Sequence, residues 1–346
     1  MTFRTETTLV GYARAAVDLK ARMVDYGRSR FARQYLDAFI TSRYADTAAD
    51  GDGSPSPKLV QALDRVAHEP WQLGTPYVLA PAMTAIVAAA AEALDLTDEI
   101  VAKDTAPDDG GVLFLPEPIY HRGHRGDVTS IGAITWATLH NTSSGQLTWV
   151  ICGWADRDDP LDPAAARRRQ QLADAPHLAT QFGPYVLNSL AEIPIGRPVD
   201  PRPDPPAVDD ADRDWQPAPD GRYCIDETTI RLGTCAAIIY AFWRIQAQPL
   251  ATVAHPPLDR PARRRAARAS IMHDTRVVML RRTSPITEPG DGEAKWHYRV
   301  RFVVRGHWRR LVDAHGQPYR IWIHAHIKGP DGAPLLHGEK VAVLAR

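Results

Sequence analysis

Hydrophobic and polar residues follow a helical period over the first part of the chain. From Leu9 to Ile40 the apolar side chains recur three and four positions apart, with charged residues between them, which is the pattern of amphipathic helices. A loop rich in glycine and proline at 50–57 precedes a second helical pattern from Leu59 to Val66. The alanine-rich stretch 78–101 predicts a longer, buried helix. We therefore expect residues 1–105 to form a helical N-terminal region.

Residues 106–196 carry a strand pattern instead. A short apolar run occupies 112–115, and β-branched and aromatic residues are concentrated at 130–140 and 146–154, as is typical of strands. The polar residues between the last two segments predict a hairpin turn. This part of the chain is expected to be a small α/β region with a small central antiparallel sheet.

A segment rich in proline and aspartate, 197–222, has almost nothing to bury and is expected to be a linker or a long surface loop. After it, the apolar residues from Ile230 to Ile245 predict a buried helix, capped by Asp226 and ended by Pro249. A basic run at 260–268 leads into a predicted strand. The predicted fold class is α+β, and residues 223–346 are expected to hold a helix and a basic C-terminal β domain.

From His297 onward, a period of two predicts an antiparallel hairpin with two different faces. The apolar face, expected in the core, includes Trp308, Ile321 and Ile323. The other face is cationic, and Trp322 is expected to point outward from it. Arginine binds phosphate and an exposed indole stacks on a base. The residues predicted to contact nucleic acid are Arg299, Arg301, Arg305, Arg309, Arg320, Trp322 and Lys328.

Charge is divided unevenly along the chain, although the formal net charge is zero. Residues 260–346 hold 18 Lys and Arg against 7 Asp and Glu, and the preceding residues hold 23 against 34. Such asymmetry indicates an anionic partner for the basic part, nucleic acid first among them, with DNA and RNA both open. The alternative is that the acidic part covers the basic part within the molecule, with the arginines paired and the tryptophan packed inside.

The hairpin also resembles a known family. The strings Val304-Arg305-Gly306-His307-Trp308-Arg309, Ile321-Trp322-Ile323, Lys328-Gly329-Pro330 and Pro334-Leu335 are similar to the C-terminal box of a family of uncharacterised actinobacterial and phage- or plasmid-associated proteins. Weaker similarity extends to 112–118 and 242–268. The chain departs from the family at Arg310-Leu311, where asparagine and glutamine are expected. The resemblance implies a bacterial cytosolic protein in a mobile-element context, and it assigns no catalytic residue. In that context we expect the chain to bind nucleic acid in a regulatory or accessory role.

An enzymatic alternative uses the histidines of the same sheet. His307, His324 and His326 are candidate general acids and bases of a metal-independent ribonuclease-type toxin, with arginine stabilising the phosphorane-like charge. A third possibility is a protein-interaction module that binds a protein partner through the acidic N-terminal part.

Other classes of site find little support in the sequence. The pair His324 and His326 lacks further ligands at metal-binding spacing, and no phosphate loop or nucleophile elbow occurs; we expect no metal and no cofactor. Three cysteines in a long chain argue against a disulfide framework. With no secretory signal and no long apolar stretch, the chain is expected to be cytoplasmic and not to bind a membrane.

Overall fold

The fold is that of a computed structural model, which describes residues 3, 8–44, 56–123, 126–141, 145–175, 182–200, 222–230, 232–281, 302–304, 306–313, 316, 318–323 and 326–328. Its helices are α1 (Leu9–Gly27), α2 (Arg30–Tyr44), α3 (Pro57–Leu73), α4 (Pro81–Glu92), α5 (Pro163–Asp174), α6 (Thr234–Gln246) and α7 (Arg260–Ala269). Short 3-10 turns follow at Lys103–Thr105 and Glu227–Thr229. The pair of helices predicted at the start of the chain is confirmed.

Helix ends follow local chemistry. The side chains of Thr8, Ser56 and Asp162 accept hydrogen bonds from the first-turn N–H groups of α1, α3 and α5, which satisfies donors that would otherwise lack partners. Asp226 caps a 3-10 turn, not α6, which begins at Thr234 after Gly233. The predicted cap therefore serves a shorter element than expected.

The central sheet is larger than predicted and mixed, not small and antiparallel. Its strands are β1 (Thr75–Leu79), β2 (Gly110–Arg122), β3 (Val128–Asn141), β4 (Gln146–Asp156), β5 (Tyr185–Pro194), β6 (Cys224–Asp226), β7 (Ala251–Ala254) and β8 (Arg276–Leu280). They lie in the order β5-β4-β3-β2-β1-β8-β7, with β6 paired to β2. Strands β1 to β5 and β6 to β8 come from opposite sides of the proline-rich segment and share one sheet.

Strand β1, which the sequence did not predict, owes its form to its partners in the sheet. All five of its residues are buried, because β1 pairs in parallel with β2 on one side and β8 on the other, and parallel strands covered on both faces read as continuous apolar runs. Such a run cannot be told from a buried helix by periodicity. The alanine-rich stretch therefore holds a strand followed by the shorter α4. The β3–β4 hairpin is confirmed.

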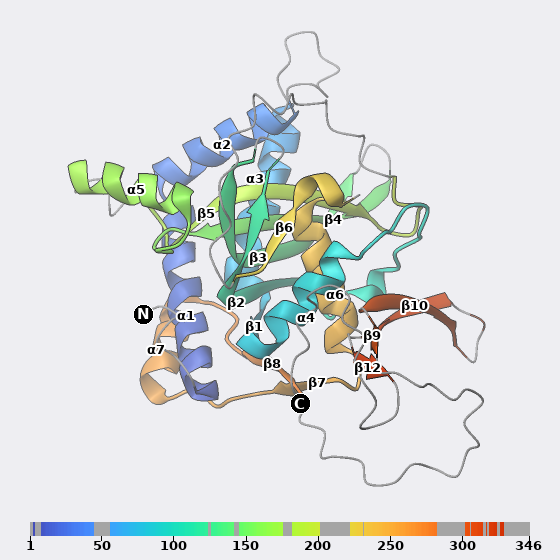
Figure 1. Ribbon diagram of the computed structural model, residues 1–346. Helices are drawn as coiled ribbons and strands as arrows, with labels where there is room; N and C mark the ends of the chain where they lie inside the picture. The colour runs from blue at the N-terminus through green and yellow to red at the C-terminus, as the bar shows by residue number, and fades with distance from the viewer. Residues whose placement is uncertain are drawn as a thin grey trace, which may run out of the picture.

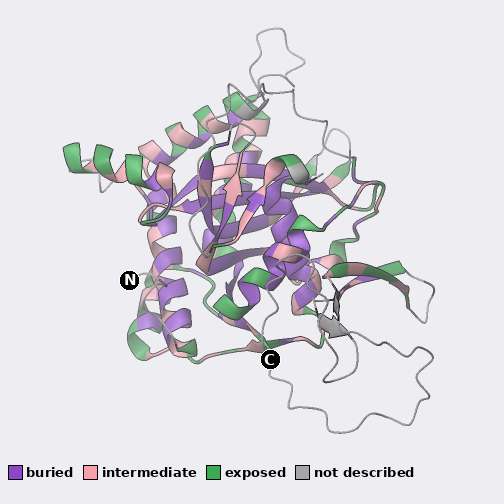
Figure 2. Ribbon diagram, in the orientation of Figure 1, coloured by how far each residue is buried: buried purple, intermediate pink, exposed green. Residues whose placement is uncertain are grey.

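Helices cover both faces of the sheet (Figure 1). One core packs α4 and α6 against it and contains Trp136, Trp149 and Trp243; the other packs α1, α2, α3 and α7 and contains Trp71 and Trp154. Burial is concentrated in the strands and in the helix sides that face them (Figure 2). The outer sides of α5 and α7 are exposed, which leaves these helices as surface elements.

The predicted C-terminal hairpin is present. Strand β10 (His307–Val312) pairs antiparallel with β11 (Pro318–Ile323), and β9 (Phe302–Val304) pairs antiparallel with β12 (His326–Lys328). In Figure 1 the β10 ribbon lies at the side of the molecule where α6 is drawn, away from α7. The hairpin and α7 are therefore separate surfaces.

Candidate nucleic-acid interface

Trp322 points into the molecule, which corrects the predicted exposed stacking surface. Its side chain is 3% exposed and belongs to the core cluster of α4 and α6. In the hairpin register Trp322 lies opposite Trp308, and directly opposed residues of an antiparallel pair share a face. The two indole rings lie 5.4 Å apart, centre to centre, and Trp308 donates from Nε1 to the Ala90 carbonyl at 2.9 Å. Both rings thus fix the hairpin to the body.

Gly306 makes room for this packing. A Cβ atom at this position would lie 2.4 Å from the Trp322 ring, which is too close for any side chain. The close approach of the buried indole therefore requires glycine at position 306.

Arg320 is also turned inward, which corrects its prediction as a phosphate contact. It is 9% exposed. Its Nε donates to Glu99 Oε1 at 2.6 Å, and its Nη1 donates to the Asp95 carbonyl at 2.7 Å. Arg310 reaches the same Glu99 oxygen at 3.1 Å from a more exposed position. Arg320 and Arg310 therefore pair with the acidic part of the chain, as in the alternative interpretation of the charge asymmetry.

The opposite face of the hairpin is the exposed one. It carries His307 and Arg309 from β10 with Tyr319, Ile321 and Ile323 from β11. Arg309 is exposed and forms no ion pair with the described residues, and Tyr319 is 37% exposed. The residues predicted for the core on β11 thus line the outer face, because the tryptophan pair decides which side of the hairpin is buried.

The other predicted contacts fall beyond what the structure describes. Arg299, Arg301, Arg305 and His324 lie outside the described residues; Lys328 and His326 are described in β12 by their backbone alone. Of the predicted ribonuclease histidines, His307 is exposed on β10. Of these three histidine side chains, the structure therefore describes His307 alone.

The densest exposed positive charge of the described residues lies on α7. Arg260, Arg263, Arg264 and Arg268 are all exposed, and at 100° per residue they occupy one side of the helix, roughly 140° wide. The opposite side, with Ala262 and Ala266 fully buried, packs against α1. The amphipathic spacing of arginine and alanine in this segment dictates that orientation.

Two acidic side chains next to α7 pair with arginines outside the exposed set of four. Asp259 caps the helix through the Ala262 N–H at 2.8 Å and pairs with Arg14 at 2.7 Å; the Ala262 N–H, and then Arg14, hold the pKa of this carboxyl below its usual value despite an opposing desolvation effect. Asp18 lies 3.9 Å from Arg265. The four exposed arginines form no ion pair with any described residue, so their charge faces solvent.

Sequence reasoning noted the arginine run but did not distinguish its members. The distinguishing signal was the helical spacing: Arg265 lies near the buried side of the helix, whereas Arg263 and Arg264 lie on the exposed side. For Trp322 the signal was its position in the hairpin, since Trp308 and Trp322 lie equally far from the turn and therefore pair.

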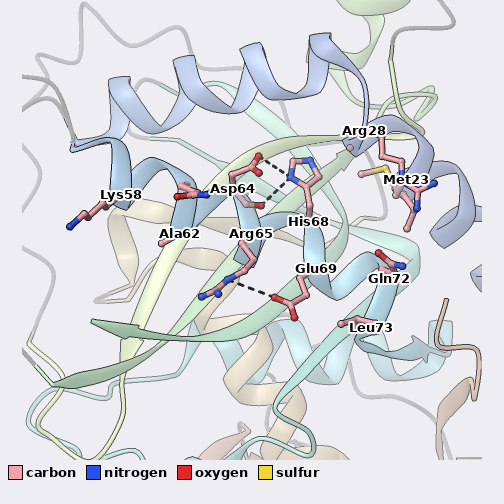
Figure 3. A pocket seen from close by; sticks show the side chains of 13 residues that line it. Met23, Arg28, Lys58, Ala62, Asp64, Arg65, His68, Glu69, Gln72 and Leu73 are labelled. Carbon is pink, nitrogen blue, oxygen red and sulfur yellow. Dashed lines mark hydrogen bonds and ion pairs between the residues drawn. The ribbon is translucent and has the colours of Figure 1, made fainter. Parts of the chain in front are cut away.

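A hollow of about 760 Å³ lies between α1 and α3, and two pairs of its charged or titratable residues interact within α3 (Figure 3). Arg65 lies 3.9 Å from Glu69, and His68 Nδ1 lies 3.4 Å from Asp64 Oδ1, each pair within one turn of α3. The floor is shaped by Gly27, where a Cβ would lie 2.5 Å from His68. The lining carries both signs of charge, with Arg28, Lys58 and Arg65 beside Asp64 and Glu69.

The acidic turn at 156–162 is occupied by donors of the protein itself. Tyr120 donates its hydroxyl proton to Asp159 at 2.7 Å, and Ser130 donates to Asp162 at 2.7 Å. These bonds anchor the start of α5. Within the described ranges, no group of three or more His, Cys, Asp or Glu side chains is arranged to hold a metal ion.

Of the helices described, none is long and apolar enough to cross a membrane. No protein-family model matches the chain, and no curated protein or solved structure is significantly similar to it.

Proposed function

We propose that the protein binds nucleic acid, and that the exposed arginine face of α7, formed by Arg260, Arg263, Arg264 and Arg268, supplies the main contact. The observation that carries the proposal is the set of four exposed guanidinium groups without an acidic partner among the described residues. Arginine binds phosphate oxygens through a planar fork of donors. A polymer of phosphates is the ligand that engages several such groups at once.

The hairpin has a secondary part in this proposal. Arg309 and Tyr319 lie on its exposed face, so they are available to a polymer, whereas Arg320 and Trp322 stabilise the hairpin. A regulatory or accessory role is part of this proposal, in the bacterial mobile-element context that the family resemblance implies.

Binding to labelled DNA and RNA, measured at low and high salt, tests the proposal. We expect a Kd of roughly 1–100 µM near physiological salt, as for backbone-dominated binding, and intact strands when the same samples are run on a denaturing gel. Shortened RNA would support the ribonuclease alternative instead, and His307→Ala would then lower turnover. Absence of binding to either polymer would contradict the proposed function and favour a protein-interaction module.

The site is tested by a variant in which Arg260, Arg263, Arg264 and Arg268 are replaced by glutamine. A matched control replaces four exposed arginines of other helices, Arg30, Arg33, Arg65 and Arg167, by glutamine. Both variants lose the same formal charge, so an effect of overall charge is equal in the two. We expect the α7 variant to lose binding and the control to change affinity less than about threefold, since distant surface charges are screened within about 10 Å.

A further inference from the structure

We infer that the ligand of the α7 arginine face is the phosphate backbone of a nucleic-acid duplex and not a single strand; this inference rests on the proposed function and narrows its ligand. The two kinds of ligand present different chemistry. A single strand exposes base faces, which its binding proteins cover with aromatic rings. A duplex hides those faces and presents its phosphates at the surface.

The segment that contains α7 lacks the large aromatic residues that stack on bases. The sequence from 255 to 274, which spans α7 and both of its flanks, holds no Phe, Tyr or Trp. Its two histidines have partners of their own: His255 lies 3.6 Å from Asp274, and His273 Nδ1 lies 3.4 Å from the Ile271 carbonyl. The exposed face of the helix therefore offers guanidinium groups and small side chains, without a ring of the kind that single-strand sites use.

The spacing of the arginines suits a regular row of phosphates. At 1.5 Å per residue, Arg260 and Arg268 lie about 12 Å apart along the helix axis, with Arg264 midway. One strand of a duplex carries a phosphate every 3.4 Å of its axis, so this length faces about three or four phosphates. The number of phosphates in reach is close to the number of exposed arginines.

The helix can also approach a rigid surface closely. Ala267 is exposed between Arg263, Arg264 and Arg268 and adds no bulk to the face. Because α7 is packed on α1 and fixed at its start by the Asp259–Arg14 pair at 2.7 Å, the four arginines share a fixed frame. A duplex, stiffer than a single strand, matches such a preformed row at lower cost in conformational freedom.

Fluorescence anisotropy with four probes tests the inference: a 20-base-pair DNA duplex, an RNA duplex of the same sequence, and one single strand of each. For the whole chain we expect both duplexes, or the one of preferred geometry, to bind at least tenfold more tightly than the corresponding single strand. In the four-glutamine variant of α7, duplex affinity should fall by roughly 10³-fold at 0.1 M salt, on the basis of about four released counterions.

Replacement of the same four arginines by lysine keeps the charge and serves as the folding control. We expect this variant to retain duplex preference. If single strands bind as tightly as duplexes or more tightly, and the glutamine variant loses that binding, the duplex inference is overturned and the proposed function stands. Duplex binding that survives in the glutamine variant would overturn the assignment to α7. Absence of binding to all four probes would contradict the proposed function itself.

Discussion

Trp322 is a structural residue, and its burial decides what its loss would do. The side chain is 3% exposed and packs against Trp308 in the cluster of α4 and α6. A buried tryptophan contributes through the apolar area it removes from water and through its close contacts. Its removal affects stability first, and nucleic-acid binding only where the hairpin itself is lost.

Trp322→Ala is predicted to lower the free energy of unfolding by roughly 3–5 kcal/mol, the usual cost of truncating a buried large aromatic residue. Chemical denaturation followed by circular dichroism measures it. Tyr319→Ala, three residues earlier on the exposed face, is the control and should cost less than about 1 kcal/mol. A similar small effect for both substitutions would show that Trp322 is not packed as described.

Lys20 is a second residue whose buried environment allows a specific prediction, here about how stability depends on pH. It is fully buried on α1, donates from Nζ to the Gly74 carbonyl, and forms no ion pair with a described residue. Burial disfavours the charged ammonium and lowers its pKa from 10.5 to about 7. The unfolded chain, in which the side chain is hydrated, keeps the proton up to the usual pKa.

Between about pH 7 and 10.5 the unfolded state therefore binds more protons at Lys20 than the folded state. Stability contributed by this group should rise with pH across that window, by about 1.4 kcal/mol per unit at most. Lys20→Met should remove this rise, whereas Lys58→Met, at an exposed position of α3, should keep it. Denaturation midpoints between pH 7.5 and 9.5 measure the difference, and equal slopes in the two variants would contradict it.

At the scale of elements, one carboxylate with two unequal partners adds to the contacts that hold the hairpin to the body. Glu99 pairs with the buried Arg320 and with Arg310, whose side chain is 72% exposed. A charge pair shielded from water is costly to break on one side, since the remaining charge is left uncompensated. An exposed pair contributes little because water and salt screen it.

Glu99→Ala is predicted to destabilise the protein by about 2–3 kcal/mol, because it leaves Arg320 in a buried position without its carboxylate. Arg310→Ala removes the exposed partner of the same carboxylate and should cost less than about 1 kcal/mol. Thermal melts of the two variants, measured side by side, test the ranking. The reverse order would mean that the hairpin is not docked through Arg320.

Elements with local signals were predicted from the sequence, and those that depend on distant partners were not. Helices α1 and α2 and the β3–β4 hairpin follow from spacing and turn residues alone. Strand β1 owes its form to β2 and β8, which lie far from it in the sequence, so its apolar run was ambiguous. The alternation of residue types divided β11 into two faces correctly. Which face is buried depends on the packing of Trp322 near α4 and α6, and a sequence period does not show such packing.

At the scale of the whole molecule, the basic C-terminal part is used in two ways. On the hairpin, Arg320 and Arg310 pair with Glu99 of the acidic part, so part of the charge asymmetry is neutralised internally. On α7, four arginines are exposed without acidic partners among the described residues. The placement of Arg320 and Trp322 on an exposed cationic face was therefore wrong, because net charge does not report which arginines are paired.

The most direct test is the salt dependence of duplex binding by the whole chain and by its α7 four-glutamine variant. A contact that releases counterions from Z phosphates gives a slope of log K against log salt near −0.9Z. With four arginines engaged, the slope should lie near −3.6 and become less steep by about 3.6 units in the variant, while the Arg30, Arg33, Arg65 and Arg167 control keeps the original slope. An unchanged slope in the α7 variant would contradict binding through this helix.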